Sequence, residues 1–222
     1  MRETIHEEKI GGLTIKVFPD ETFGDSPAEW FGNELFLVGY HREFDVRNDA
    51  VVTGAQCRAI LTGEYESAEE RQSVKELKTR YHVYGLEAYI HSGVVLALAK
   101  EGNFPDRYWD VSTLGAVFVR RKEFPTATKA RKAAQNLIRD WNDYLSGNVY
   151  GYSVEDENGD SVASCWGFYG DIEKSGLLEQ AREEAKAHNT SEAIEKRKEE
   201  HKQATIKKAR ALLEPYGIKL KN

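Results

Sequence analysis

The chain has 222 residues, a formal net charge of −6 and 40% apolar residues, 11% of the total being aromatic. This composition is rich enough in apolar residues for a core, which excludes a disordered chain. No run of about 18 apolar residues occurs, so we expect no membrane span. The N-terminal residues MRETIHEEKIGG lack the apolar stretch of a signal peptide. We therefore expect the protein to work in the cytoplasm of the cell that makes it.

In the first half of the chain, short alternating or continuous apolar runs predict strands. We expect them at residues 13–18, 34–40, 81–90, 94–99 and 114–120. The strand at 34–40 contains a continuous apolar run, which predicts that both of its faces are covered. The segment 45–81 is the least patterned part, and within it we expect short helices at 55–61 and 68–80. The aromatic stretch GNFPDRYWD, residues 102–110, contains Gly and Pro and is expected to form a loop.

The second half begins with the best predicted helix, residues 126–145, which has Thr126 as its N-cap and apolar residues at three- and four-residue steps. Two alternating runs follow, at residues 149–154 and 161–166. Asn158-Gly159 lies between them, and this pair supplies the residues that a type I′ turn needs. The sequence therefore predicts a β-hairpin.

The tail differs from the body in charge. Residues 176–222 carry 11 Lys and Arg against 8 Asp and Glu, whereas residues 1–175 carry 20 against 29. The acidic body argues against nucleic-acid binding through a basic face and is compatible with a basic partner. Helices are expected at 177–187 and 192–213, with Asn189 capping the second.

The second tail helix has a polar first half and then one apolar stripe. The stripe is expected to bind a partner or a second copy of the chain, and it consists of Ile206, Ala209, Leu212 and Leu213. Together these patterns predict an α+β domain over residues 5–172, with a mostly antiparallel sheet packed by the 126–145 helix. A separable, charged helical extension is predicted at 176–222.

Several motifs occur in a fixed order along the body. They are Asp25-Ser26-Pro27 with Trp30 and His41-Arg42, then Tyr89-Ile90-His91-Ser92-Gly93, then Trp109-Asp110 with Gly115 and Val119, and last YLSGNVYGY and SCWGFYG around the hairpin. In these motifs the chain resembles, over residues 20–172, a widespread family of uncharacterised proteins encoded by bacteriophages and prophages. The resemblance implies a phage-encoded accessory protein and assigns no catalytic role. The segment 45–81 and the tail depart from the family pattern.

Polar chemistry in the body centres on His91. With Ser92, Asp110 and His41 it offers residue types used for acid/base, nucleophilic or metal chemistry, and Cys165 is a candidate nucleophile with His91 as its base. No Gly-x-Ser-x-Gly elbow is present. The same residues are explained by a tight turn at Ser92-Gly93, and a thiol among aromatics is typically buried and inert. The structural interpretation is therefore favoured over catalysis.

No cofactor or metal is expected. Phosphate-binding glycine loops are absent, and neither Cys57 nor Cys165 has a second ligand at zinc spacing. The four tryptophans could stack on single-stranded nucleic acid, but without a basic groove they are better interpreted as core. They are Trp30, Trp109, Trp141 and Trp166.

The leading functional hypothesis is a phage-encoded accessory protein that binds a host or phage protein in the host cytoplasm and counters a defence system. It rests on the resemblance, the acidic body and the missing catalytic signature. One alternative is a small hydrolase or metal-dependent enzyme centred on His91. Another is a DNA-mimic inhibitor, which would need the body's acidic residues gathered on one face.

Overall fold

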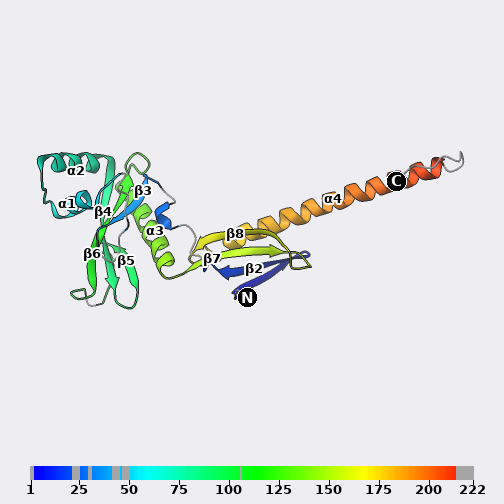
Figure 1. The fold of residues 1–222 in the computed structure, drawn as a ribbon, viewed down its shortest axis with the longest axis horizontal. Helices are drawn as coiled ribbons and strands as arrows, with labels where there is room; N and C mark the ends of the chain where they lie inside the picture. The colour runs from blue at the N-terminus through cyan, green and yellow to red at the C-terminus, as the bar shows by residue number, and fades with distance from the viewer. Residues whose placement is uncertain are drawn as a thin grey trace. The chain divides into compact units, whose positions relative to one another are not determined.

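The structure is a computed structural model, and it describes residues 3–21, 26–29, 32–41, 46, 51–105 and 107–213. Within the C-terminal helix, side chains are described at 177–191, 193, 195, 196, 198, 199, 202 and 203. The predicted motif residues Asp25, Trp30 and Arg42 lie outside the described residues. The α+β class is confirmed, with helices and two separate antiparallel sheets (Figure 1).

The chain divides into two compact units. Unit 1 comprises Met1–Phe18, Gly151–Trp166 and Ile172–Asn222, and unit 2 comprises Pro19–Tyr150 and Gly167–Asp171. The predicted boundary between a body at 5–172 and a tail at 176–222 does not follow this division. The N-terminal strands, the hairpin and the C-terminal helix belong to the same unit.

Unit 2 is built on a sheet of order β3-β6-β4-β5. Its strands are β3 (Leu35–Gly39), β4 (Tyr81–Ile90), β5 (Val94–Leu98) and β6 (Val111–Arg120), and all three neighbouring pairs are antiparallel. A short 3₁₀ turn, η1 (Pro27–Glu29), precedes β3. All five residues of β3 are buried, as its continuous apolar run predicted.

Helices cover both faces of this sheet (Figure 1). On one face α3 (Ala127–Leu145) packs Ala134, Leu137 and Trp141 against β-strand residues such as Leu86. Its N-cap is Thr126, as predicted, which accepts a hydrogen bond from the Lys129 amide. This helix therefore fixes one layer of the core.

The other face is covered by α1 (Gly54–Thr62) and α2 (Ala68–Arg80), close to the predicted bounds. Thr53 and Gln56 form a capping box at the start of α1, and Ser67 caps α2. Buried Cys57 and Leu77 contact the sheet side on which Phe118 lies. The weakly patterned segment 45–81 thus supplies the second layer of unit 2.

Unit 1 contains a sheet of order β1-β2-β7-β8. Its strands are β1 (His6–Ile10), β2 (Leu13–Pro19), β7 (Val149–Glu155) and β8 (Ser161–Tyr169). Strand β1 was not predicted from the sequence, because its residues HEEKI carry no apolar alternation. It forms as an edge strand antiparallel to β2, with Ile10 opposite Leu13. Strand β1 therefore forms because its backbone pairs with β2 across the short turn at Gly11-Gly12. An apolar pattern in its own side chains is not the cause.

The β7–β8 hairpin forms as predicted, but its turn is not type I′. Asn158 does not have the positive φ that type I′ needs, whereas Gly159 has φ +86°. The Gly159 amide donates to the Asp156 carbonyl at 3.1 Å, and the Asp156 carboxylate accepts from the amides of Asn158 and Asp160. The Asp156 side chain organises the turn and allows Asn158 to keep an ordinary φ.

A single helix, α4 (Leu177–Leu213), replaces the two tail helices that were predicted. Asn189 does not cap a new helix; its side-chain amide donates to the Ile10 carbonyl at 3.1 Å. Arg182 binds the Glu8 carboxylate through two nitrogens at 2.6 and 3.0 Å. The start of α4 is therefore held against β1.

The first turns of α4 also belong to the unit 1 core. The buried side chains on this part of the helix are Leu177, Leu178, Ala181 and Ala185. Their burial contradicts the prediction that residues 176–222 are separable from the body. Two almost completely buried leucines cannot be removed without uncovering the apolar residues that they cover.

Candidate functional site

The structure brings together two of the four residues expected at a polar site, His91 and Asp110. Strand β4 pairs with β6 so that Tyr89 lies opposite Val111, and the Ile90 amide donates to the Asp110 carbonyl at 2.9 Å. His91 Nδ1 then lies 3.5 Å from Asp110 Oδ2. Antiparallel pairing of β4 and β6 is thus the reason that these side chains meet.

The other two predicted residues lie elsewhere. His41 follows β3, and the neighbouring Tyr40 amide donates to the Leu114 carbonyl, four residues along β6 from Asp110. Four residues of strand span about 13 Å, so the register does not carry His41 to Asp110. Cys165 belongs to β8, in a segment of unit 1, and its thiol lies 3.9 Å from the Trp166 carbonyl.

The His91–Asp110 pair has few of the features of a catalytic or metal site. The carboxylate at Nδ1 would orient the ring as in acid/base sites, but the His91 side chain is 68% exposed. In the part of the chain that the structure describes, the Ser92 hydroxyl makes no hydrogen bond. The described residues also contain no group of three or more His, Cys, Asp or Glu side chains able to hold a metal. We therefore interpret the His91–Asp110 pair as a solvent-exposed contact between the ends of two loops.

The β5–β6 loop, residues 99–110 with 106 outside the described part, is held in place by several side-chain contacts. The Glu87 carboxylate accepts from the Lys100 amide at 3.2 Å and from Arg107 Nη2 at 2.6 Å. Arg107 Nη1 also donates to the Gly102 carbonyl at 2.8 Å. Lys100 has φ +69°, the one positive φ among the described residues other than glycine. Glu87 thus ties both ends of the loop to β4.

Further contacts hold the middle of the loop. The Phe104 ring stacks on Tyr89 with a centroid distance of 5.7 Å. Glu101 forms an ion pair with Arg131 and accepts a hydrogen bond from Gln135, both on α3. The loop is therefore fixed against β4 and α3 before any ligand arrives.

This braced loop presents two adjacent aromatic side chains to solvent. Tyr108 is 98% exposed and Trp109 is 89% exposed, and Val95 on β5 is also an exposed apolar side chain. The prediction that the tryptophans belong to the core is wrong for Trp109 and for Trp166, whose side chain is also exposed. It is right for buried Trp141. The signal available in the sequence was an aromatic pair inside a Gly- and Pro-containing loop, where no apolar alternation accompanies it.

The two cysteine thiols differ in their burial. Cys57 is buried in the α1–sheet layer, and desolvation raises the pKa of its thiol to about 12. A thiol with so high a pKa is neutral and unreactive near neutral pH. Cys165 is half-buried. Neither thiol lies in a cluster of described metal-binding side chains.

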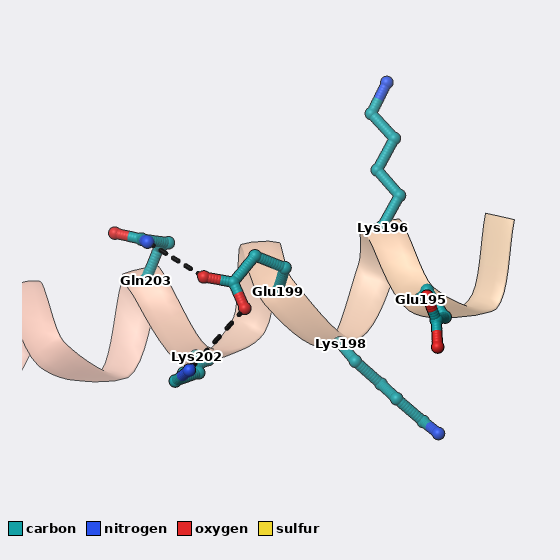
Figure 2. Close-up of a pocket in the computed structure, with 6 residues that line it drawn as sticks. All are labelled: Glu195, Lys196, Lys198, Glu199, Lys202 and Gln203. Atoms are coloured by element: carbon teal, nitrogen blue, oxygen red, sulfur yellow. Dashed lines mark hydrogen bonds and ion pairs between the residues drawn. The ribbon is translucent and has the colours of Figure 1, made fainter. Parts of the chain in front are cut away.

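On α4 a shallow groove lies between charged side chains (Figure 2). Figure 2 shows that they all project from one helix, with Glu199 bonded to Gln203 at 2.9 Å and to Lys202 at 3.7 Å. These side chains point in different directions and do not converge on one point (Figure 2). The predicted binding stripe lies farther along α4, and its side chains are outside the described residues: Ile206, Ala209, Leu212 and Leu213.

Among the described helices, none combines the length and apolar character needed to cross a bilayer. Comparisons with protein-family models, curated proteins and solved structures gave no match. The functional assignment therefore depends on the residues and on their geometry.

Proposed function

We propose that this protein acts by binding another protein, and that Tyr108 and Trp109 form the centre of the contact surface. The observation that carries the proposal is the near-complete exposure of two adjacent large aromatics on a braced loop. Exposed apolar side chains that lie next to one another mark interaction sites more often than single ones do. Trp and Tyr are also the residues that most often dominate protein–protein binding energy.

The bracing of the loop supports the same proposal. A side chain that is already held in place loses less conformational freedom on binding, so more of its buried area contributes to affinity. The Arg107–Glu87 pair and the Phe104–Tyr89 stack provide this preorganisation. A loop that served only to connect β5 to β6 would need none of these contacts.

The biological setting is the second part of the proposal. The family resemblance over residues 20–172 supports a phage-encoded accessory protein, and the acidic body supports a protein target over a nucleic acid. Several acidic side chains are paired with Arg or Lys, including Glu8, Glu87 and Glu155, which weakens the DNA-mimic alternative. We propose that the target belongs to a host defence system.

The experiment compares wild-type protein with a Tyr108→Ser/Trp109→Ser double variant. Proteins captured from host lysate by the wild type are purified, and their affinity for each form is measured directly. We expect the double variant to bind at least about tenfold more weakly and to lose any advantage in phage plating on defended hosts. Ile5→Ser, which removes an exposed apolar side chain from unit 1, is the matched control.

Two results would overturn the proposal. One is an unchanged affinity of the double variant for every captured protein. The other is an equal loss in the Ile5→Ser control, which would show a general effect of surface hydrophobicity. Circular dichroism melting of each variant establishes that the comparison concerns folded protein.

A second candidate, an enzyme centred on His91, is favoured by one observation, the 3.5 Å contact with Asp110. Hydrolysis of generic ester and phosphodiester substrates by wild type, His91→Ala and Asp110→Asn would test it. Activity that falls by about a hundredfold or more in both variants would support this candidate. Equal turnover by all three forms would remove it.

A further inference from the structure

Strand β5 forms one edge of the unit 2 sheet, with β4 as its neighbour among the described strands. Directly after β5, the Ala99 amide donates to the Gly85 carbonyl of β4 at 2.7 Å. Because hydrogen-bonding directions alternate along an antiparallel strand, the backbone of Leu96 faces away from β4. Leu96 is the central residue of the five in β5. A strand added at this edge would therefore have Leu96 at the centre of its pairing.

The outward backbone groups of Leu96 are already bonded to a side chain of α3, which lies against β5 (Figure 1). The Asn142 side-chain oxygen accepts from the Leu96 amide at 2.7 Å, and the Asn142 side-chain nitrogen donates to the Leu96 carbonyl at 3.0 Å. A carboxamide carries the same kinds of donor and acceptor as a peptide group, so Asn142 takes the place of a residue in a neighbouring strand. The Leu98 carbonyl is occupied as well, by the Glu101 amide at 2.9 Å.

The composition of β5 favours association if this edge is left open. Its residues VVLAL include no charge and no proline, and Val95 is 45% exposed. Uncharged apolar edge strands pair readily with strands of other molecules, and proteins prevent this with charges, proline or a covering element. Strand β1, an edge of the other sheet, carries Glu7, Glu8 and Lys9. Strand β5 has no such charges, so its protection has to come from outside the strand.

We propose that Asn142 is a clamp that keeps β5 from pairing with β5 of a second copy of the chain. Two copies of one edge strand fit each other in antiparallel pairing, because this arrangement is symmetric. Trp141, buried between α3 and the sheet, anchors the helix next to Asn142 and so holds the amide at the edge. Without that amide, a second β5 would supply both partners of the Leu96 backbone. This proposal does not depend on the role proposed for Tyr108 and Trp109.

The test compares wild type with Asn142→Leu, which keeps the approximate size of the side chain and removes both hydrogen bonds. The molar mass of the full chain is measured by size-exclusion chromatography with light scattering over a range of protein concentrations. We expect Asn142→Leu to rise toward about twice the wild-type mass as the concentration increases. Asn136→Leu, at an exposed position of the same helix, is the matched control and should keep the wild-type mass.

A second substitution identifies the strand through which the molecules associate. Val95→Lys adds a charge to the exposed face of β5, and antiparallel pairing of two copies would bring these like charges close together. Val95→Lys should therefore return Asn142→Leu to the wild-type mass. The wild-type mass for Asn142→Leu at every concentration would overturn the proposal. Association that persists with Val95→Lys, or that Asn136→Leu shows equally, would overturn it too, because it would not run through β5.

Hydrogen exchange in wild type tests the clamp without any substitution. The Leu96 amide faces away from β4 and donates to Asn142. We expect it to exchange at least about tenfold more slowly than amides that make no hydrogen bond. Exchange at the rate of an exposed amide would contradict the clamp. Should Asn142→Leu show no cooperative melting by circular dichroism, Asn142→Ala replaces it in the mass measurement, with the same expected result and the same results that would overturn the proposal.

Discussion

The Arg107 guanidinium donates to the Glu87 carboxylate across 2.6 Å, and the same carboxylate accepts from the Lys100 amide. Glu87 belongs to β4, whereas Arg107 directly precedes the exposed pair Tyr108 and Trp109. The side chain of a regular strand therefore fixes the position of a loop that would otherwise move. This contact connects the stable sheet of unit 2 to the surface proposed to bind a partner.

Arg107→Ala should loosen the loop without unfolding unit 2. The pair is partly exposed, so its loss should cost at most about 1 kcal/mol of stability. Amide hydrogen exchange in residues 99–110 should become faster, and partner affinity should fall by about 1 kcal/mol as preorganisation is lost. Arg139→Ala, which removes an exposed arginine paired with neighbouring Asp140, is the control and should change neither. Unchanged exchange in Arg107→Ala would show that Glu87 does not hold the loop.

Trp109→Phe should lower the solvent accessibility of the tryptophan fluorescence. Because Trp109 is exposed and Trp141 is buried, acrylamide quenching should decrease in Trp109→Phe and increase in Trp141→Phe. The emission maximum should shift to shorter wavelength in the first variant. The opposite order of quenching would mean that the loop buries Trp109 in solution.

Removing residues 176–222 should destabilise unit 1. The deletion uncovers the apolar residues that Leu177 and Leu178 cover, and each leucine contributes about 1.5–3 kcal/mol by burial. A chain that ends after residue 191 keeps these leucines, the Arg182–Glu8 pair and the Asn189–Ile10 hydrogen bond. Thermal melting should therefore show a large loss for the longer deletion and a small one for the shorter. If the chain without residues 176–222 melts at the same temperature as the chain that ends after residue 191 and as the wild type, α4 is dispensable for the core.

The Arg182–Glu8 pair should make unit 1 sensitive to acid. The hydrogen bond from Arg182 lowers the pKa of the Glu8 carboxyl below its ordinary value of 4.5. Since the folded pKa is the lower one, the contribution is present above the unfolded value and is lost as the pH falls through the folded value. Between pH 5 and pH 3, the melting temperature should fall more steeply in wild type than in Glu8→Gln. Parallel curves would contradict this role of the pair.

Gly115→Ala should disrupt the pairing of β3 with β6. A Cβ atom at this position would lie 1.9 Å from the Val38 carbonyl oxygen, a backbone atom that cannot move away without breaking the ladder. We expect a loss of about 1–3 kcal/mol in urea unfolding. Gly93→Ala is the control, because no atom lies within 4 Å of its Cβ position. An unchanged free energy of unfolding in Gly115→Ala would mean that β3 can shift without loss of stability.

The sequence alone determined the elements whose signals are local. Strands β3 and β4 and helices α2 and α3 lie within a residue of their predicted bounds, because apolar periodicity and capping residues such as Thr126 act over a few neighbours. The His91 and Asp110 side chains were also recognised as candidates in the sequence. The sequence shows that these two residue types are present, but it does not show how far apart their side chains lie in the fold.

Only the tertiary structure decided the features that depend on residues far apart in the chain. Strand β1 forms through its pairing with β2. Helix α4 continues past Asn189, whose side-chain amide donates to the Ile10 carbonyl and does not cap a new helix. The sequence places Trp109 in a loop but does not show which way its side chain points; its exposure follows from the direction of a loop held by Glu87. The burial of a side chain depends on residues that are distant in the sequence and close in the fold. Composition and periodicity describe only residues that are neighbours in the sequence.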